Sequence, residues 1–127
     1  LYSSADVLDI VNATSANQPT LVDARSFERF AGQEEPIDPV AGHIPGAHCL
    51  PFIDNLDENG YFKPPGQLAE RFAQYHDPNN LVCYCGSGVT ATHNILAARL
   101  AGLPEPGLYA DSWSGWITDP SRPWTTL

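Results

Sequence analysis

Residues 81–90 combine three features that constrain the fold. They read Leu81-Val82-Cys83-Tyr84-Cys85-Gly86-Ser87-Gly88-Val89-Thr90. The first four residues form a continuous apolar run, which is typical of a strand that is covered on both faces. The two glycines predict a turn directly after it, and residues 89–100 read as a helix that stops at Gly102. The segment therefore predicts a strand, a tight loop and a helix in succession.

The rest of the chain continues this alternation of strands and helices. Predicted strands cover residues 20–24, 47–50 and 107–110, and predicted helices cover residues 3–13, 27–30, 67–76 and 112–117. The first helix has a capping signal, because Asp6 follows Ser3 by three residues. In the helix 89–100 we expect Leu96 and Leu100 to face inward. The alternation predicts an α/β fold with a mostly parallel sheet.

Length, composition and charge exclude several classes of function. The chain has 127 residues, of which 43% are apolar and 17% charged, so we expect one globular domain over residues 1–127. Six Lys and Arg against fifteen Asp and Glu give a net charge of −9, which disfavours nucleic-acid and anionic membrane partners. No apolar stretch is long enough for a transmembrane helix. The chain contains no methionine and starts without a signal peptide, so we expect a processed protein or a piece of a larger one.

The cysteines and histidines match no disulfide framework and no metal motif. Three cysteines cannot all pair with one another, which favours a reducing compartment and hence the cytoplasm. The four histidines are scattered without metal-ligand spacing, so we expect neither a metal nor another cofactor. We interpret Cys49 and Cys83 as inert core thiols.

Cys85 differs from the other two cysteines in its surroundings. It follows a buried strand and precedes two glycines and a helix N-terminus. Backbone N–H groups turned inward by such a loop, together with the partial positive charge of the helix end, favour a thiolate. We therefore predict that Cys85 is a nucleophile. The hydroxyl groups of Ser87 and Thr90 add donors to the same loop.

Two other uses of this loop are disfavoured by missing residues. A phosphate-binding loop of the P-loop type requires a lysine that is absent here. A cysteine phosphatase requires an arginine six residues after its cysteine, and Ala91 occupies that position. Both interpretations are therefore weaker than a nucleophilic cysteine.

Four segments resemble the motifs of the rhodanese superfamily of sulfurtransferases. Residues 85–91 resemble its active-site loop, in the version found in 3-mercaptopyruvate sulfurtransferases. Residues 23–32, 42–47 and 108–116 are similar, in order and spacing, to its opening motif, its second motif and the closing motif of the catalytic C-terminal domain. The resemblance implies a rhodanese-like fold with about five strands in the sheet and helices on both faces.

The resemblance also implies a function. A Cys85 thiolate would take a sulfane sulfur from thiosulfate or 3-mercaptopyruvate and pass it, as a persulfide, to cyanide or a thiol. The residues that would bind the anionic donor are Arg29, Gly86, Ser87, Gly88, Val89 and Thr90. We interpret Asp23, Arg25 and His43 as structural, and the tryptophans as packing residues: Trp113, Trp116 and Trp124.

Two positions depart from the family's motifs. Ile37 follows Glu35-Pro36 where mercaptopyruvate enzymes often carry a second arginine. Gly86 and Ser87 stand where thiosulfate enzymes often carry basic residues. The choice between the two donors therefore stays open. Two-domain members also have an N-terminal sister domain, which implies that this chain is one half of such a protein.

Two alternatives remain beside this interpretation. Arg29 could serve only in a surface salt bridge, with Asp23, Glu28 or Glu35 as its partner. The whole domain could be a non-catalytic rhodanese-like module that binds or regulates another protein.

Overall fold

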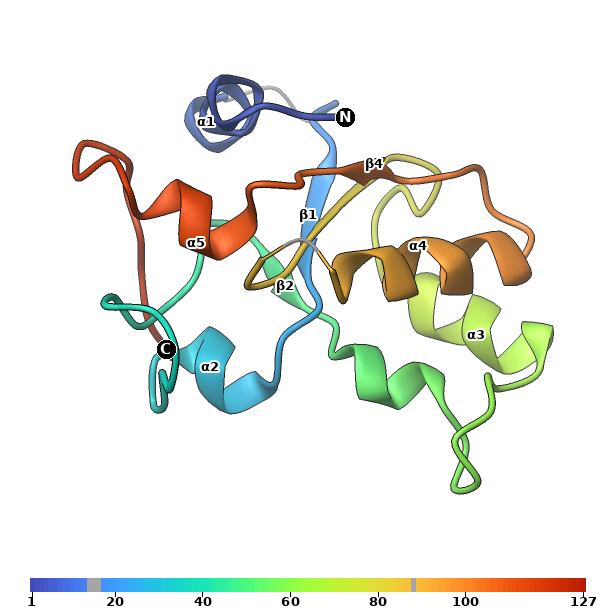
Figure 1. Cartoon of the computed structure of the whole chain (residues 1–127). Helices are drawn as coiled ribbons and strands as arrows, with labels where there is room; N and C mark the ends of the chain where they lie inside the picture. The colour runs from blue at the N-terminus through green and yellow to red at the C-terminus, as the bar shows by residue number, and fades with distance from the viewer. Residues whose placement is uncertain (14–16, 88) are drawn as a thin grey trace.

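The computed structural model describes residues 1–13, 17–87 and 89–127. In these residues four parallel strands form one sheet (Figure 1). Their order is β2-β1-β3-β4, and they span β1 Thr20–Asp23, β2 His48–Cys49, β3 Leu81–Tyr84 and β4 Gly107–Leu108. The helices are α1 Ser4–Asn12, α2 Phe27–Ala31, α3 Pro65–Phe72, α4 Ala91–Leu100 and α5 Ser112–Trp116, with a 3-10 helix, η1, at Phe52–Asn55. The predicted α/β fold is confirmed.

The described sheet has four strands, where about five were expected. The difference lies beside β4, at the edge of the sheet. There the backbone N–H of Tyr2 donates to the carbonyl of Leu108 at 2.8 Å. One hydrogen bond does not make a ladder, so the N-terminal segment runs along the edge without adding a strand.

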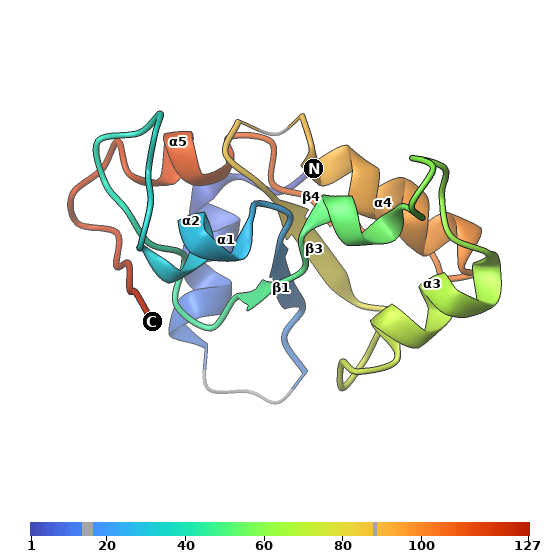
Figure 2. The same ribbon diagram turned by 90° about the horizontal axis from the view of Figure 1, so that it is seen from below.

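Helices cover both faces of the sheet, as expected. Neighbouring residues of a strand point to opposite faces, so each strand contributes to two cores. Val22 and Cys83 share a core with α3 and α4, whereas Leu21, Val82 and Tyr84 share the other core with α1 and α5. Figure 2 shows α3 and α4 on one side of the strands and α1, α2 and α5 on the other.

The inward face of α4 differs from the prediction. Leu96 and Leu100 are 47% and 42% exposed, and the buried residues are Ala91, Asn94, Ala97 and Ala98. Asn94 explains the difference, because its Nδ2 donates to the carbonyl of Leu50 at 2.9 Å and its Oδ1 accepts from Asn55 Nδ2 at 2.7 Å. These buried hydrogen bonds fix the rotation of the helix and turn the two leucines outward.

Several helix boundaries also differ from the prediction, and α3 begins at Pro65 rather than at residue 67. Helix α3 ends at Phe72 rather than at residue 76, and Gln74 Nε2 donates to the last-turn carbonyl of Arg71 at 2.6 Å. This side-chain bond satisfies a carbonyl that a longer helix would have used. Helix α4 begins at Ala91, two residues later than expected, and Thr90 is its N-cap.

The tryptophans divide into two groups. Trp113 and Trp116 are fully buried, which confirms their interpretation as packing residues. Trp124 is 52% exposed, so that interpretation was wrong for this residue. Its segment is held by the backbone instead, since Thr125 and His43 exchange hydrogen bonds of 2.8 and 3.0 Å.

The predicted cap of the first helix is confirmed. Ser3 Oγ accepts from the N–H of Asp6 at 3.1 Å, and Asp6 Oδ2 accepts from the N–H of Ser3 at 2.8 Å. We expect Ser3→Ala to lower the free energy of unfolding by about 1 kcal/mol, measured by urea denaturation. Ser3→Thr keeps the hydroxyl and is the matched control. An equal loss in both variants would show that the hydroxyl does not act as a cap.

The carboxyl ends of β1 and β3 meet in the middle of the sheet. Their register places Asp23 beside Tyr84. After β1 the chain continues to β2 on one side, and after β3 it continues to β4 on the other. Where two connections part in this way, they leave a crevice above the sheet that commonly binds ligands.

Candidate active site

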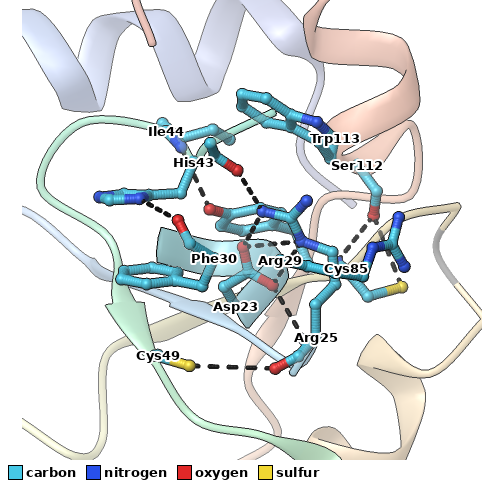
Figure 3. Close-up of polar contacts among 12 residues, drawn as sticks. Asp23, Arg25, Arg29, Phe30, His43, Ile44, Cys49, Cys85, Ser112 and Trp113 are labelled. Carbon is cyan, nitrogen blue, oxygen red and sulfur yellow. Dashed lines mark hydrogen bonds and ion pairs between the residues drawn. The ribbon is translucent and has the colours of Figure 1, made fainter. Parts of the chain in front are cut away.

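Cys85 is the first residue after β3 and lies directly at this crevice. It is 1% exposed. Its backbone N–H donates to Ser112 Oγ at 3.1 Å, and the same hydroxyl oxygen lies 4.0 Å from Cys85 Sγ. Figure 3 shows Ser112 beside the Cys85 sulfur. The residue is therefore fixed by a side chain from α5 as well as by its own strand.

Helix α5 also orients the peptide groups of the loop. The carbonyls of Cys85 and Gly86 accept from the N–H groups of Trp113 and Ser114, both at 2.9 Å. In a trans peptide the next N–H points away from the carbonyl, so the N–H groups of Gly86 and Ser87 point away from α5. No described residue accepts a hydrogen bond from these two N–H groups. They are available to an anion.

Ser112 supports the loop from a strained backbone conformation. Its φ is 55°, and it is the only described non-glycine residue with positive φ. The left-handed region costs such a residue about 1–2 kcal/mol. Its hydroxyl also donates to the carbonyl of Tyr109 at 2.9 Å, which holds the side chain in place. No role for this serine was predicted from the sequence.

The N-terminus of α4 lies at the other end of the loop. Helix α4 has ten residues, and its N-cap Thr90 makes no side-chain capping bond. The first N–H groups of a helix have no partner within the helix and carry a partial positive charge. This end of α4 therefore adds to the attraction for an anion at the loop.

A cavity of about 160 Å³ opens beside the loop. It is lined by Arg29, Ile37, Asp38, Gly86, Ser87, Val89, Thr90 and Ser114. The structure thus brings together five of the predicted donor-binding residues, while Gly88 lies outside the described residues. A larger hollow of about 280 Å³ lies by the amino end of β1, away from the loop, so we place the site at the smaller one.

Arg29 reaches the loop from α2. Its guanidinium lies 3.3–3.8 Å from the position that a Cβ at Gly86 would take, so a side chain at this position would press against Arg29. The guanidinium also forms the salt bridge considered above with Glu35, at 3.0 Å, and not with Asp23 or Glu28. A second carboxylate, Asp38, lies 3.5 Å from Arg29 Nη2. Arg29 therefore both lines the cavity and has acidic partners.

Glu35 is held in its charged form. Burial by itself would raise the pKa of Glu35. Hydrogen bonds from the N–H of Asp38, the Arg29 guanidinium and the N–H of Ile37 outweigh burial and lower this pKa below its ordinary value. The negative charge of Glu35 therefore stays beside Arg29.

A family model described as rhodanese-like domain matches residues 5–119. The chain belongs to the rhodanese-like family. The resemblance drawn from the four sequence segments is therefore confirmed.

Relatives and a solved structure agree with this assignment. A Pseudomonas aeruginosa protein named "Probable 3-mercaptopyruvate sulfurtransferase" is 60% identical over 109 residues, which are 84% of this chain and 38% of that protein. The thiosulfate sulfurtransferase of Cricetulus griseus is 40% identical over 102 residues, or 76% and 34% of the two chains. The crystal structure of Tum1 from Saccharomyces cerevisiae matches with a TM-score of 0.83 at 31% identity, covering 99% of this chain and 46% of that one. This rhodanese-like chain spans less than half the length of each.

The opening motif of the rhodanese-like domain forms a buried ion pair. Arg25 Nη2 contacts Asp23 Oδ2 at 2.7 Å and also donates to the carbonyl of Gly42 at 2.6 Å. Burial opposes the charge of Arg25, but the hydrogen bonds and charge of Asp23 outweigh it and raise the pKa of Arg25. His43 stacks on Phe30, and its Nδ1 lies 2.6 Å from the carbonyl of Phe30. These contacts join segments of the fold, which supports the structural interpretation of Asp23, Arg25 and His43.

The other two cysteines of the rhodanese-like domain are poor nucleophiles. Burial, followed by the charge of Asp23, raises the pKa of Cys49 to about 12. Burial and the neighbouring Cys85 raise the pKa of Cys83 to about 12. Both therefore remain thiols at neutral pH, and the thiolate is the reactive form of cysteine.

The described residues offer no group of three or more His, Cys, Asp or Glu side chains that is placed to hold a metal ion. None of the helices in the described part of the chain is long and apolar enough to span a membrane.

Sequence reasoning missed three residues of this site. Ser112 braces Cys85, and Asp38 and Ser114 line the cavity together, with Ser114 Oγ donating to Asp38 Oδ1 at 2.8 Å. Asp38 and Ser114 are separated by 76 positions, so no local spacing relates them. Ser112 lies within the closing motif, residues 108–116, but only its positive φ in the structure distinguishes it from its neighbours.

Proposed function

We propose that this rhodanese-like domain transfers a sulfane sulfur from a small anionic donor to a thiol or to cyanide through a persulfide on Cys85. The donor is 3-mercaptopyruvate or thiosulfate, the compounds in the names of its relatives. The observation that carries the proposal is the setting of Cys85. Of the three cysteines, only Cys85 lies in a loop in which two N–H groups, those of Gly86 and Ser87, have no acceptor among the described residues. The N-terminus of α4 and the cavity lie beside this loop.

The reaction has two steps. The Cys85 thiolate attacks the sulfane sulfur, and the bond from that sulfur to the rest of the donor breaks, releasing sulfite from thiosulfate or pyruvate, after protonation, from 3-mercaptopyruvate. The acceptor then attacks the outer sulfur of the persulfide and restores the Cys85 thiolate. The N–H groups of Gly86 and Ser87 stabilise the negative charge of the outer sulfur, as an oxyanion hole does for oxygen.

The test is a mass measurement of the protein after incubation with each donor and removal of the excess. We expect a gain of one sulfur atom, which is lost again when cyanide is added. An unchanged mass with both donors would refute the proposal. A module that only binds a partner needs no reactive cysteine and would gain no sulfur.

Arg29 is the proposed binding residue for the donor's anionic group. We expect Arg29→Gln to raise the KM for 3-mercaptopyruvate by roughly 10- to 100-fold, the effect of losing one charge-assisted hydrogen bond. Arg99→Gln is the control, because Arg99 is exposed and pairs only with Glu105 among the described residues. If Arg29→Gln lowers thermal stability and leaves KM unchanged, the salt bridge with Glu35 is its whole role.

The wider setting of the domain is part of the proposal. The matched relatives are more than twice as long as the aligned region. We place this chain as the catalytic half of a protein with an N-terminal sister rhodanese-like domain. None of its three cysteines is in a disulfide, which favours a reducing compartment, for which the cytoplasm is our proposal.

A further inference from the structure

The cavity beside Cys85 has an acidic wall. The side chain of Asp38, which lines the cavity, is 10% exposed. Its Oδ1 accepts from Ser114 Oγ at 2.8 Å, but its buried Oδ2 accepts no hydrogen bond from any described residue. A buried carboxylate oxygen without a donor is costly. The nearest cation to this oxygen is Arg29 Nη2 at 3.5 Å, so Oδ2 keeps the capacity to accept a hydrogen bond from a donor group bound beside it.

Two carboxylates, Glu35 and Asp38, lie beside Arg29. Glu35 accepts from Arg29 Nε at 3.3 Å and from Nη2 at 3.0 Å, and Asp38 Oδ2 lies 3.5 Å from Nη2. One positive and two negative side chains leave this group with a net charge of −1. A dianion therefore gains little attraction here. The remaining nitrogen, Nη1, has no acceptor among the described residues and lies next to Gly86.

These contacts define two adjacent subsites of opposite charge. Arg29 Nη1 can receive one carboxylate on the side of the loop, and Asp38 Oδ2 can receive an ammonium group. The two side chains approach within 3.5 Å of each other, so the groups they bind must also be close together. An α-amino acid carries an ammonium and a carboxylate on one carbon and meets this condition.

We propose that Asp38 is a specificity-determining residue that binds the ammonium group of a small amino-acid thiol, whose carboxylate lies on Arg29. The inference rests on the function proposed above and assigns this ligand to the acceptor step. The cavity, at about 160 Å³, is smaller than the roughly 300 Å³ of ordinary ligand pockets and suits only a small molecule. Ile37 and Val89 give it an apolar side for the methylene of the ligand.

The chemistry of the step is balanced without a further reagent. The thiolate of the bound ligand attacks the outer sulfur of the Cys85 persulfide, and the bond between that sulfur and Cys85 Sγ breaks. Cys85 leaves as a thiolate and the ligand leaves as a persulfide. The ammonium group stays on Asp38 throughout and takes no part in the sulfur exchange.

Two pairs of compounds isolate the ammonium group. S-methyl-L-cysteine and 3-(methylthio)propionate differ only in this group and cannot accept sulfur. We expect the full-length protein to bind the first about tenfold more tightly by calorimetry, and the Asp38→Asn variant to bind both about equally. L-cysteine and 3-mercaptopropionate are the reactive pair. We expect the ratio of kcat/KM for L-cysteine to kcat/KM for 3-mercaptopropionate to be about tenfold lower in Asp38→Asn than in the wild type. The two thiols differ in reactivity, but this difference cancels because the same two compounds are compared in both proteins.

Glu34→Gln is the matched control, since Glu34 is an exposed acid of the same segment and its removal changes the net charge equally. The proposal is overturned if the wild type binds neither methyl compound or shows no preference. It is also overturned if Asp38→Asn keeps the preference, or if Glu34→Gln loses it as well. Sulfur loading of Cys85 is followed separately by mass. Failure to load would refute the proposed function, while the calorimetric preference would still decide the role of Asp38.

Discussion

Replacing Cys85 by serine is expected to abolish both the gain of sulfur and its transfer. A serine hydroxyl cannot form a persulfide, so the covalent step is lost. Loss of the nucleophile in enzymes with covalent intermediates lowers kcat by on the order of 10³-fold or more. Mass measurement after incubation with 3-mercaptopyruvate and a steady-state assay with cyanide would both show this loss. The fold is expected to survive, because the backbone N–H of residue 85 keeps its bond to Ser112 Oγ.

The matched control is Cys49→Ser. Cys49 is half-buried, and its pKa, raised to about 12, keeps it in the unreactive thiol form. We expect this variant to load sulfur as the wild type does. Sulfur on the Cys85→Ser protein, or no sulfur on the Cys49→Ser protein, would show that Cys85 is not the cysteine that carries the sulfur.

Replacing Asp23 by asparagine is expected to have the largest effect on stability. Asp23 and Arg25 are both buried, and Asp23 provides two carboxylate oxygens to Arg25 Nε and Nη2. Asparagine has nearly the same shape but no charge, so it leaves the guanidinium buried without its main partner. Glu35, at 3.4 Å, compensates in part. We expect a loss of about 3 kcal/mol in the free energy of unfolding and a decrease in Tm of roughly 10 °C.

Glu105→Gln is the control for this experiment. Glu105 forms an ion pair with Arg99 at 3.5 Å, and both side chains are exposed. Exposed pairs contribute little, so Tm should hardly change. Equal effects of the two substitutions in calorimetric melting would show that burial of the Asp23–Arg25 pair does not determine its contribution.

Local patterns predicted the parts of the fold that depend on neighbouring residues. The apolar run of β3 is buried along its whole length, and the loop after it carries four of the residues that were assigned to the site: Gly86, Ser87, Val89 and Thr90. The rotation of α4 about its axis, which decides which of its residues are buried, could not be predicted from neighbouring residues. It depends on Asn94, whose partners Leu50 and Asn55 are 44 and 39 positions away. A helix that is fixed by buried amide groups does not follow the hydrophobic pattern on which the prediction relied.

The candidate site shows the same division. Cys85 and Gly86 were found because strand, glycine and helix follow one another directly. Asp38 lies in a segment rich in turn-forming residues, which no periodic pattern assigns to the site. Its relation to Arg29 and Ser114 arises only when the connections after β1 and β4 meet beside the loop.

The strained conformation of Ser112 limits how this position can change during evolution. Glycine would relieve the backbone but remove the hydroxyl that holds the N–H of Cys85, and alanine would keep the strain and lose the same bond. Large or β-branched residues suit neither the left-handed backbone nor a fully buried site. Selection for stability and selection for the geometry of Cys85 therefore act on this residue in opposite directions. Position 112 is one at which a more stable descendant of this protein would be a poorer catalyst.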